Sequence, residues 1–207
     1  MSTIQDDILD RIRTHGRGKV FIPKDFLDLG SRYAADQSLS RLVKSGDIQR
    51  LGRGLYHYPQ RRERPRRLTA PDLDEVASAL ARRTGSRVVP SGAMAAHRLG
   101  LSKQVPARSV YLTDGRTRLV RIGKTLIEIR HGAPKELPVM SQTAAMVFQA
   151  LRFIGRDAVD DAVISKVRKA LSLEQRRELL REVNYTTDWI AAAVRLVSRE
   201  EEALQEV

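Results

Sequence analysis

The 207-residue sequence contains no cysteine, which excludes disulfide bonds, thiolate metal sites and cysteine nucleophiles. Aromatic residues make up only 5% of it against 42% hydrophobic residues, so its core must be mainly aliphatic. It has no run of about 18 apolar residues, and its amphipathic first segment, with three aspartates before Arg13, does not resemble a signal peptide. We therefore expect a soluble, cytoplasmic protein.

Positive charge is what the sequence has in excess. Its formal net charge is +12 and its isoelectric point is near 10.5. Such a charge attracts polyanions, of which nucleic acid is the commonest and an acidic membrane surface the next, although a merely basic protein remains an alternative. Residues 1–67 hold fifteen Lys and Arg against eight Asp and Glu, and the remaining 140 residues hold 22 against 17. The charge therefore favours an N-terminal nucleic-acid interface.

The N-terminal sixty residues show the element order of a winged helix-turn-helix. Apolar periodicity and capping residues predict three helices, over residues 3–15, 24–29 and 31–45, with Ser31 as the N-cap of the third. Alternation then predicts two strands, 48–51 and 55–58, joined by a bend at Gly52-Arg53-Gly54. In a winged helix-turn-helix the third helix enters the major groove and the hairpin contacts the flanking backbone or minor groove.

The polar face of the third predicted helix supplies the candidate DNA contacts. Its aliphatic stripe faces inward, which turns outward a set of residues that can read base edges: Arg32, Tyr33, Asp36, Gln37, Ser40 and Arg41. Phosphate contacts are expected from cations around it and on the hairpin: Lys19, Lys24, Lys44, Arg50 and Arg53. An amphipathic helix with arginines outside is usually only a solvated face, and the complete element order is what favours DNA binding here.

The sequence predicts an α+β protein with two domains. Residues 1–59 form the winged helix-turn-helix, residues 60–68 a basic exposed linker, and residues 69–207 a mixed domain with a small antiparallel sheet and a helical C-terminus. Within the second domain, Thr69 to Asp72 are predicted to begin the first helix. The expected helices span 72–83, 92–99, 142–154, 159–170, 173–183 and 189–204, and the extended segments span 88–90, 110–113, 119–122 and 126–129.

No catalytic or metal-binding constellation emerges from the sequence. The four histidines lie far apart, and Asp160 and Asp161, as neighbours on a helix, point about 100° apart. We therefore expect no enzyme activity, no cofactor and no metal. Two alternatives stay open. One is an enzyme acting on nucleic acid through residues distant in sequence. The other is a protein-interaction module whose basic face meets an acidic partner.

Two segments carry a family resemblance: Pro23 to Tyr58, and Pro90 to Pro106 with its sequence PSGAMAAHRLGLSKQVP. They resemble the AbiEi-type antitoxins of type IV toxin–antitoxin systems, over roughly residues 3 to 195. The resemblance implies an N-terminal winged helix that binds and represses its own promoter, and a C-terminal domain that opposes a nucleotidyltransferase-like toxin. The expected partners are thus an operator in double-stranded DNA, as an inverted repeat bound by two copies of the protein, and this toxin.

Overall fold

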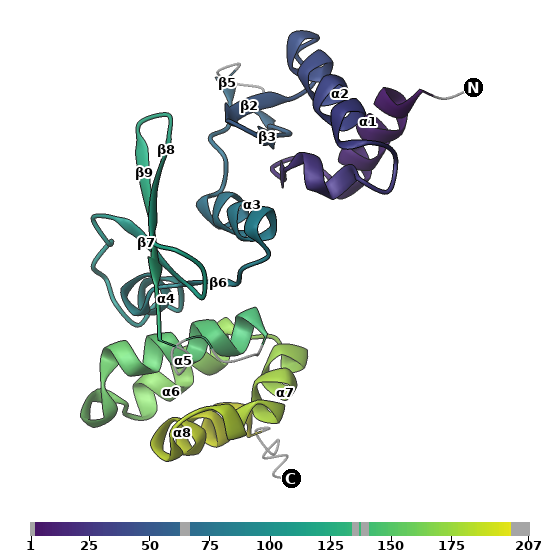
Figure 1. Cartoon of the computed structure of the whole chain (residues 1–207). Coiled ribbons are helices and arrows are strands. Elements are labelled where there is room, and N and C mark those ends of the chain that lie inside the picture. The colour runs from purple at the N-terminus through teal and green to yellow at the C-terminus, as the bar shows by residue number, and fades with distance from the viewer. Residues whose placement is uncertain (1–2, 63–66, 134–136, 138–140, 200–207) are drawn as a thin grey trace. The chain divides into compact units, whose positions relative to one another are not determined.

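The computed structural model describes residues 3–62, 67–133, 137 and 141–199, and these residues form eight α-helices and short β-strands (Figure 1). The expected mixture of α and β structure is confirmed. The chain forms two compact units, the first made of Met1–Arg87 with Leu119–Ile127 and the second of Val88–Arg118 with Glu128–Val207. No helix in the described part of the chain is long and apolar enough to cross a membrane.

The first unit is built from helices around a three-stranded antiparallel sheet of order β1-β3-β2. Its elements are α1 (Ile4–His15), β1 (Val20–Phe21), the 3-10 turn η1 (Pro23–Phe26), α2 (Arg32–Lys44), β2 (Gln49–Gly52), β3 (Leu55–His57), β4 (Arg61–Arg62), β5 (Arg67–Leu68) and α3 (Leu73–Thr84).

Capping residues set where the helices of this unit begin. The Ser31 hydroxyl accepts the backbone N–H of Ala34 at 3.2 Å, so α2 begins where the sequence predicts. The prediction of an α-helix over residues 24–29 is wrong, because the structure has only a four-residue 3-10 turn there. The Asp25 carboxylate accepts the N–H of Ile22 at 3.0 Å, and the turn ends at Phe26, too soon for a full α-helix.

Strands β1 and β3 are buried on both faces of the sheet, whereas the edge strand β2 is partly exposed. All three residues of β3 are buried, although their alternation predicts a half-buried strand. Phe21 and Tyr56 pair across β1 and β3 and belong to the core that α1 and α2 form on one face. Val20 and His57 pair one residue along and so point to the opposite face. Helix α3 packs against β1, which accounts for the burial of this second face.

The segment predicted as an exposed linker, 60–68, has structure of its own. Its two ends pair as the antiparallel strands β4 and β5, and the compact unit continues through α3 to Arg87. Thr69 does not begin a helix, because its backbone N–H is bound by the carbonyl of Gln60 at 3.1 Å. The N-cap of α3 is Asp72, whose carboxylate accepts the N–H of Asp74 at 2.8 Å. The first unit therefore extends beyond the expected boundary.

The chain after Arg87 forms helices and a four-stranded sheet of order β6-β7-β9-β8, of which Leu119–Ile127 are grouped with the first unit. The remaining elements of the chain are β6 (Val88–Pro90), α4 (Gly92–Arg98), β7 (Ser109–Thr113), β8 (Arg118–Ile122), β9 (Thr125–His131), α5 (Gln142–Ile154), η3 (Arg156–Ala158), α6 (Asp161–Ala170), α7 (Leu173–Arg181), η4 (Val183–Tyr185) and α8 (Asp188–Ser198). Helix α6 begins two residues later than predicted because Asp160 caps it, accepting the N–H of Val163 at 2.8 Å. The last helix ends at Ser198, and its predicted extension beyond residue 199 lies outside the described residues.

One aliphatic core, to which α4, α5, α6, α7 and α8 all contribute, holds the second unit together. The closest approach is between α4 and α5, where a Cβ on Gly92 would lie 2.7 Å from the Cβ of Phe153 and 2.9 Å from the carbonyl oxygen of Gln149. Only glycine fits there. Trp189, the single tryptophan, is half-buried against the same core.

Candidate nucleic-acid interface

The outer face of α2 carries exposed side chains without partners. Leu39 and Leu42 of this helix are fully buried against α1 and the sheet, which turns Tyr33, Gln37 and Arg41 outward. Tyr33 is 74% exposed. Within the described part of the chain, none of the three side chains takes part in a hydrogen bond or ion pair. Tyrosine combines an apolar ring with a polar hydroxyl group and is enriched at interfaces, so Tyr33 beside Gln37 and Arg41 is a candidate contact residue.

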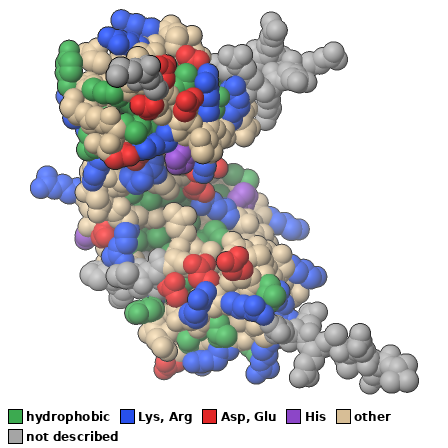
Figure 2. Space-filling view, turned by 90° about the vertical axis from the view of Figure 1, so that its right-hand side faces the viewer, with side chains coloured by type: hydrophobic (Ala, Val, Ile, Leu, Met, Phe, Trp, Pro, Cys, Tyr) green, Lys and Arg blue, Asp and Glu red, His purple; other side chains and the backbone are tan. Residues whose placement is uncertain are grey.

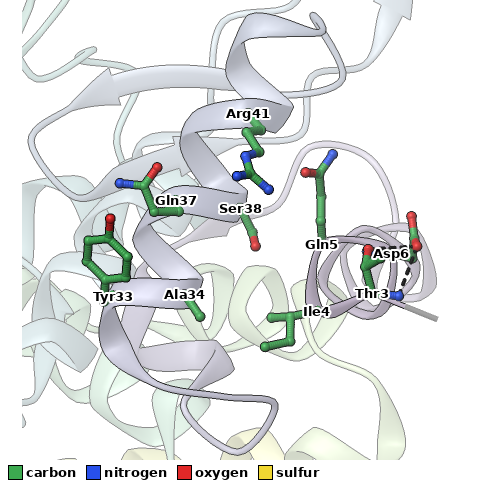
Figure 3. A pocket seen from close by; sticks show the side chains of 9 residues that line it. All are labelled: Thr3, Ile4, Gln5, Asp6, Tyr33, Ala34, Gln37, Ser38 and Arg41. Carbon is green, nitrogen blue, oxygen red and sulfur yellow. Dashed lines mark hydrogen bonds between the residues drawn. The ribbon is translucent and has the colours of Figure 1, made fainter. Parts of the chain in front are cut away.

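These side chains form one wall of a groove of about 580 Å³, and the first turn of α1 forms the other (Figure 3). The groove is lined by Thr3, Ile4, Gln5, Asp6, Tyr33, Ala34, Gln37, Ser38 and Arg41. Gln5 is a candidate contact that the sequence analysis missed, because only the packing of α1 beside α2 brings it near Arg41. Hydrogen bonds from Thr3 hold the pKa of Asp6 below its ordinary value of 3.8, so this wall keeps a negative charge.

Charged residues of α2 and of the edge strand β2 act electrostatically on the hydroxyl group of Tyr56. Burial raises the pKa of Tyr56, while the nearby cations Arg50 and Arg32 lower it and Asp36 raises it. Arg50, opposite Tyr56 in the β2–β3 register, lies on the strand face that meets α2. The fold thus brings together two predicted sets, Arg32 and Asp36 from the helix and Arg50 from the hairpin.

The turn between β2 and β3 presents Arg53 to solvent. Arg53 is exposed, and Gly54 has a φ of +64°, a conformation that L side chains rarely adopt. The register shifts between Arg50 and Gly52, so the turn contains an irregularity typical of a bulge. This geometry places a cation at the tip of the hairpin.

The other predicted phosphate contacts differ from one another in their surroundings. Lys44, in the last turn of α2, and Lys24, on η1, are both exposed. Lys19 is paired, with its Nζ 2.6 Å from Oε1 of Glu75 on α3, so its charge is partly neutralised. Ser40 is half-buried, which leaves it less accessible than Gln37.

The charges on this unit are mixed, and Figure 2 shows basic and acidic side chains side by side on the face that it presents. Arg32 Nε lies 3.0 Å from Oδ2 of Asp36, and Arg11 is bound by both carboxylate oxygens of Asp28. Among the described residues, no group of three or more His, Cys, Asp or Glu side chains could hold a metal ion. Amide and phenol groups that lie between cations can form hydrogen bonds with a polyanion. Binding of a polyanion to this surface would therefore not depend on net charge alone.

Comparison with known proteins gives a family without an assigned function. No curated protein matches the sequence. A crystal structure of the Rv2827c protein from Mycobacterium tuberculosis is similar with a TM-score of 0.42 and 14% identity, over 96% of this chain and 77% of that one. The profile described as "Family of unknown function (DUF6088)" matches residues 7–179, and the chain belongs to this family.

Proposed function

We propose that the first unit is a winged helix-turn-helix that binds double-stranded DNA, with α2 in the major groove and the β2–β3 hairpin as the wing. The observation that carries the proposal is the exposed face of Tyr33, Gln37 and Arg41, whose side chains have no hydrogen-bond or ion-pair partner among the described residues, together with a hairpin that has a cation at its tip. Arginine pairs twice with guanine and glutamine twice with adenine in the major groove, so these residue types suit base reading. Arg53 and Lys44 would contact phosphates on either side.

The element order supports this assignment. A helix, a short turn and a second helix precede an antiparallel hairpin, all within Ile4–His57. The middle helix of the motif is here the 3-10 turn η1, held by Asp25. The hairpin lies directly after α2, and Arg50 connects the two electrostatically at Tyr56. In this arrangement α2 and the hairpin contact the same duplex.

The test compares the DNA upstream of the protein's own gene with a shuffled duplex of the same length and composition, titrated by fluorescence anisotropy. Sequence-specific binding predicts tighter binding to the upstream duplex, with a binding constant that falls steeply as salt is raised. Equal affinity for both duplexes at every salt concentration would contradict specific recognition. If neither duplex is bound, the DNA-binding proposal fails and the alternative of an acidic protein partner is the one to test.

The AbiEi resemblance extends the proposal to a repressor and antitoxin. The protein would act in the cytoplasm, bind an inverted-repeat operator in its own promoter as two copies, and oppose a nucleotidyltransferase-like toxin. The test is co-expression with the product of the neighbouring gene. Growth arrest by that product, relieved by this chain, supports the antitoxin role. The absence of relief contradicts it without bearing on DNA binding.

A further inference from the structure

Helix α3 is bound to the DNA-binding surface by polar contacts as well as by apolar packing. The buried side of α3 is aliphatic and includes Val76, Ala77 and Leu80. Its polar contacts reach three separate parts of the unit: the start of β1, the η1 turn and the tip of the hairpin. These contacts connect α3 to the elements that flank α2 in the sequence, η1 before it and the hairpin after it.

The first two contacts fix α3 beside β1 and η1. Glu75 binds Lys19 at 2.6 Å, just before β1. Arg82 donates to the carbonyl oxygen of Val20 at 2.9 Å and to both carboxylate oxygens of Asp25 at 3.1 Å. Because the Asp25 carboxylate also closes η1, Arg82 ties α3 to the turn that leads into α2.

The third contact is to the hairpin tip. Arg83, next to Arg82 on the last turn of α3, donates from a guanidinium nitrogen to the carbonyl oxygen of Arg53 at 3.1 Å. The carbonyl oxygen of Gly52 accepts a longer bond of 3.4 Å from Arg50, within the hairpin itself. Arg83 is thus a link from outside the hairpin to the residue whose side chain forms its cationic tip.

We propose that α3 is part of the DNA-binding unit and that Arg83 is a positioning residue, which orients the Arg53 turn so that the Arg53 guanidinium faces the DNA phosphates. The inference rests on the proposed function, since it assigns a role within the same surface. The inference also assigns α3, which lies beyond residues 1–59, to the DNA-binding unit. In this arrangement Arg83 acts through Arg53 and makes no DNA contact of its own.

A double-mutant cycle separates this role from a direct contact. If Arg83 acts through Arg53, Arg83→Ala and Arg53→Ala each lower the salt-dependence slope of DNA binding by about 1, and the double variant loses no more than Arg53→Ala alone. Additive losses would overturn the proposal, because they would mean that Arg83 binds phosphate directly. Arg83→Lys, which keeps a charged donor, is expected to restore part of the loss. Arg13→Ala, which removes the same charge from α1, is the control.

A second measurement needs no DNA. In the full-length protein, the backbone order parameters of Arg53 and Gly54, from nitrogen-15 relaxation, are expected to fall from about 0.85 toward 0.6 in Arg83→Ala and to stay unchanged in Arg13→Ala. Unchanged order parameters in Arg83→Ala would overturn the positioning role even if DNA binding weakened. If the wild type binds no DNA, the proposed function fails and this inference fails with it, whereas a mobile turn in Arg83→Ala would still show that the contact itself holds the hairpin.

Discussion

Nε of Arg32 lies 3.0 Å from Oδ2 of Asp36, so the first cation on the outer face of α2 is paired one turn along the helix. The pair is about half exposed, with side-chain exposures of 58% and 46%, and contributes little to stability. Its consequence is electrostatic. Asp36 places a negative charge on the surface that we propose to face DNA, and it occupies a guanidinium that could otherwise bind phosphate.

Asp36→Asn is therefore expected to strengthen DNA binding a few-fold on all sequences, consistent with the roughly 0.2–1 kcal/mol of an exposed charge pair. The measurement is a set of anisotropy titrations on upstream and shuffled duplexes. Asp10→Asn changes the net charge equally at an exposed site on α1 and is expected to have a smaller effect. Weaker binding in Asp36→Asn, confined to one sequence, would instead indicate that Asp36 accepts a hydrogen bond from a cytosine amino group.

Substitutions at Gln37 and at Arg53 are expected to affect DNA binding in different ways. Gln37→Ala removes a base-reading amide, so discrimination at one base pair falls by about 1–3 kcal/mol while binding to shuffled DNA changes little. Arg53→Ala removes a phosphate contact and weakens binding to all duplexes alike. A panel of operator variants, each with one base pair changed, measures both effects. Uniform losses in both variants would refute this division of roles.

Tyr33→Ala tests the exposed aromatic side chain. Because Tyr33 is 74% exposed and has no partner in the described structure, its removal is expected to leave the free energy of unfolding within about 0.5 kcal/mol of wild type. DNA affinity is expected to fall. Tyr185→Ala, at a side chain 57% exposed on η4 of the second unit, is the matched control and is expected to change neither quantity. An unchanged affinity in Tyr33→Ala would remove this residue from the interface.

His57 makes the stability of the first unit depend on pH. It is fully buried on β3, and neither ring nitrogen has a hydrogen-bond partner among the described residues. Burial lowers the pKa of His57 from its ordinary value of 6.5, so the unfolded chain takes up the proton first. The stabilising contribution of the neutral ring is complete above pH 6.5 and is lost as the pH falls below that value toward the folded-state pKa.

Urea unfolding followed by circular dichroism at several values between pH 8 and pH 5 measures this loss. The wild-type free energy of unfolding is expected to fall by at most about 1.36 kcal/mol per pH unit below pH 6.5. His57→Leu is expected to abolish most of this slope, whereas His15→Gln, at an exposed histidine, keeps it. Identical slopes in wild type and His57→Leu would exclude His57 as the titrating group.

Gly92→Ala is expected to destabilise the second unit by about 1–3 kcal/mol, because the new methyl group would force α4 away from α5. The added Cβ would meet the Cβ of Phe153 at 2.7 Å. Gly52→Ala is the control, since no atom lies within 4 Å of a Cβ built there. Thermal unfolding of both variants measures the difference. Equal melting temperatures would show that the α4–α5 contact can relax without cost.

Local signals were sufficient to predict where α2 and α7 begin. Ser31 caps α2 as its sequence position indicates, and α7 begins at Leu173 as predicted, with Ser172 and Gln175 forming a capping box there. The outward side of α2 was predicted correctly as well, since the buried positions Leu39 and Leu42 fix the rotation of the helix. Such features depend on residues within one or two turns of each other.

The remaining features depend on contacts between residues far apart in the sequence. The alternation of Leu55 to Tyr58 predicts one solvated face, but all of β3 is buried, and α3 packs against the neighbouring strand β1, which no pattern within β3 indicates. Gln5 enters the candidate site only because α1 packs beside α2. The pairing of Lys19 with Glu75, 56 residues apart, likewise could not be predicted from its basic neighbourhood.

Trp189 packs against the core of the second unit, and the first unit contains no tryptophan. Indole emission therefore reports melting of the helical C-terminal part alone, whereas circular dichroism reports both parts. Recording the two signals on one heated sample assigns each transition to its unit without cutting the chain. The loss of stability at low pH that we attribute to His57 would then change the circular dichroism signal and leave the tryptophan fluorescence unchanged.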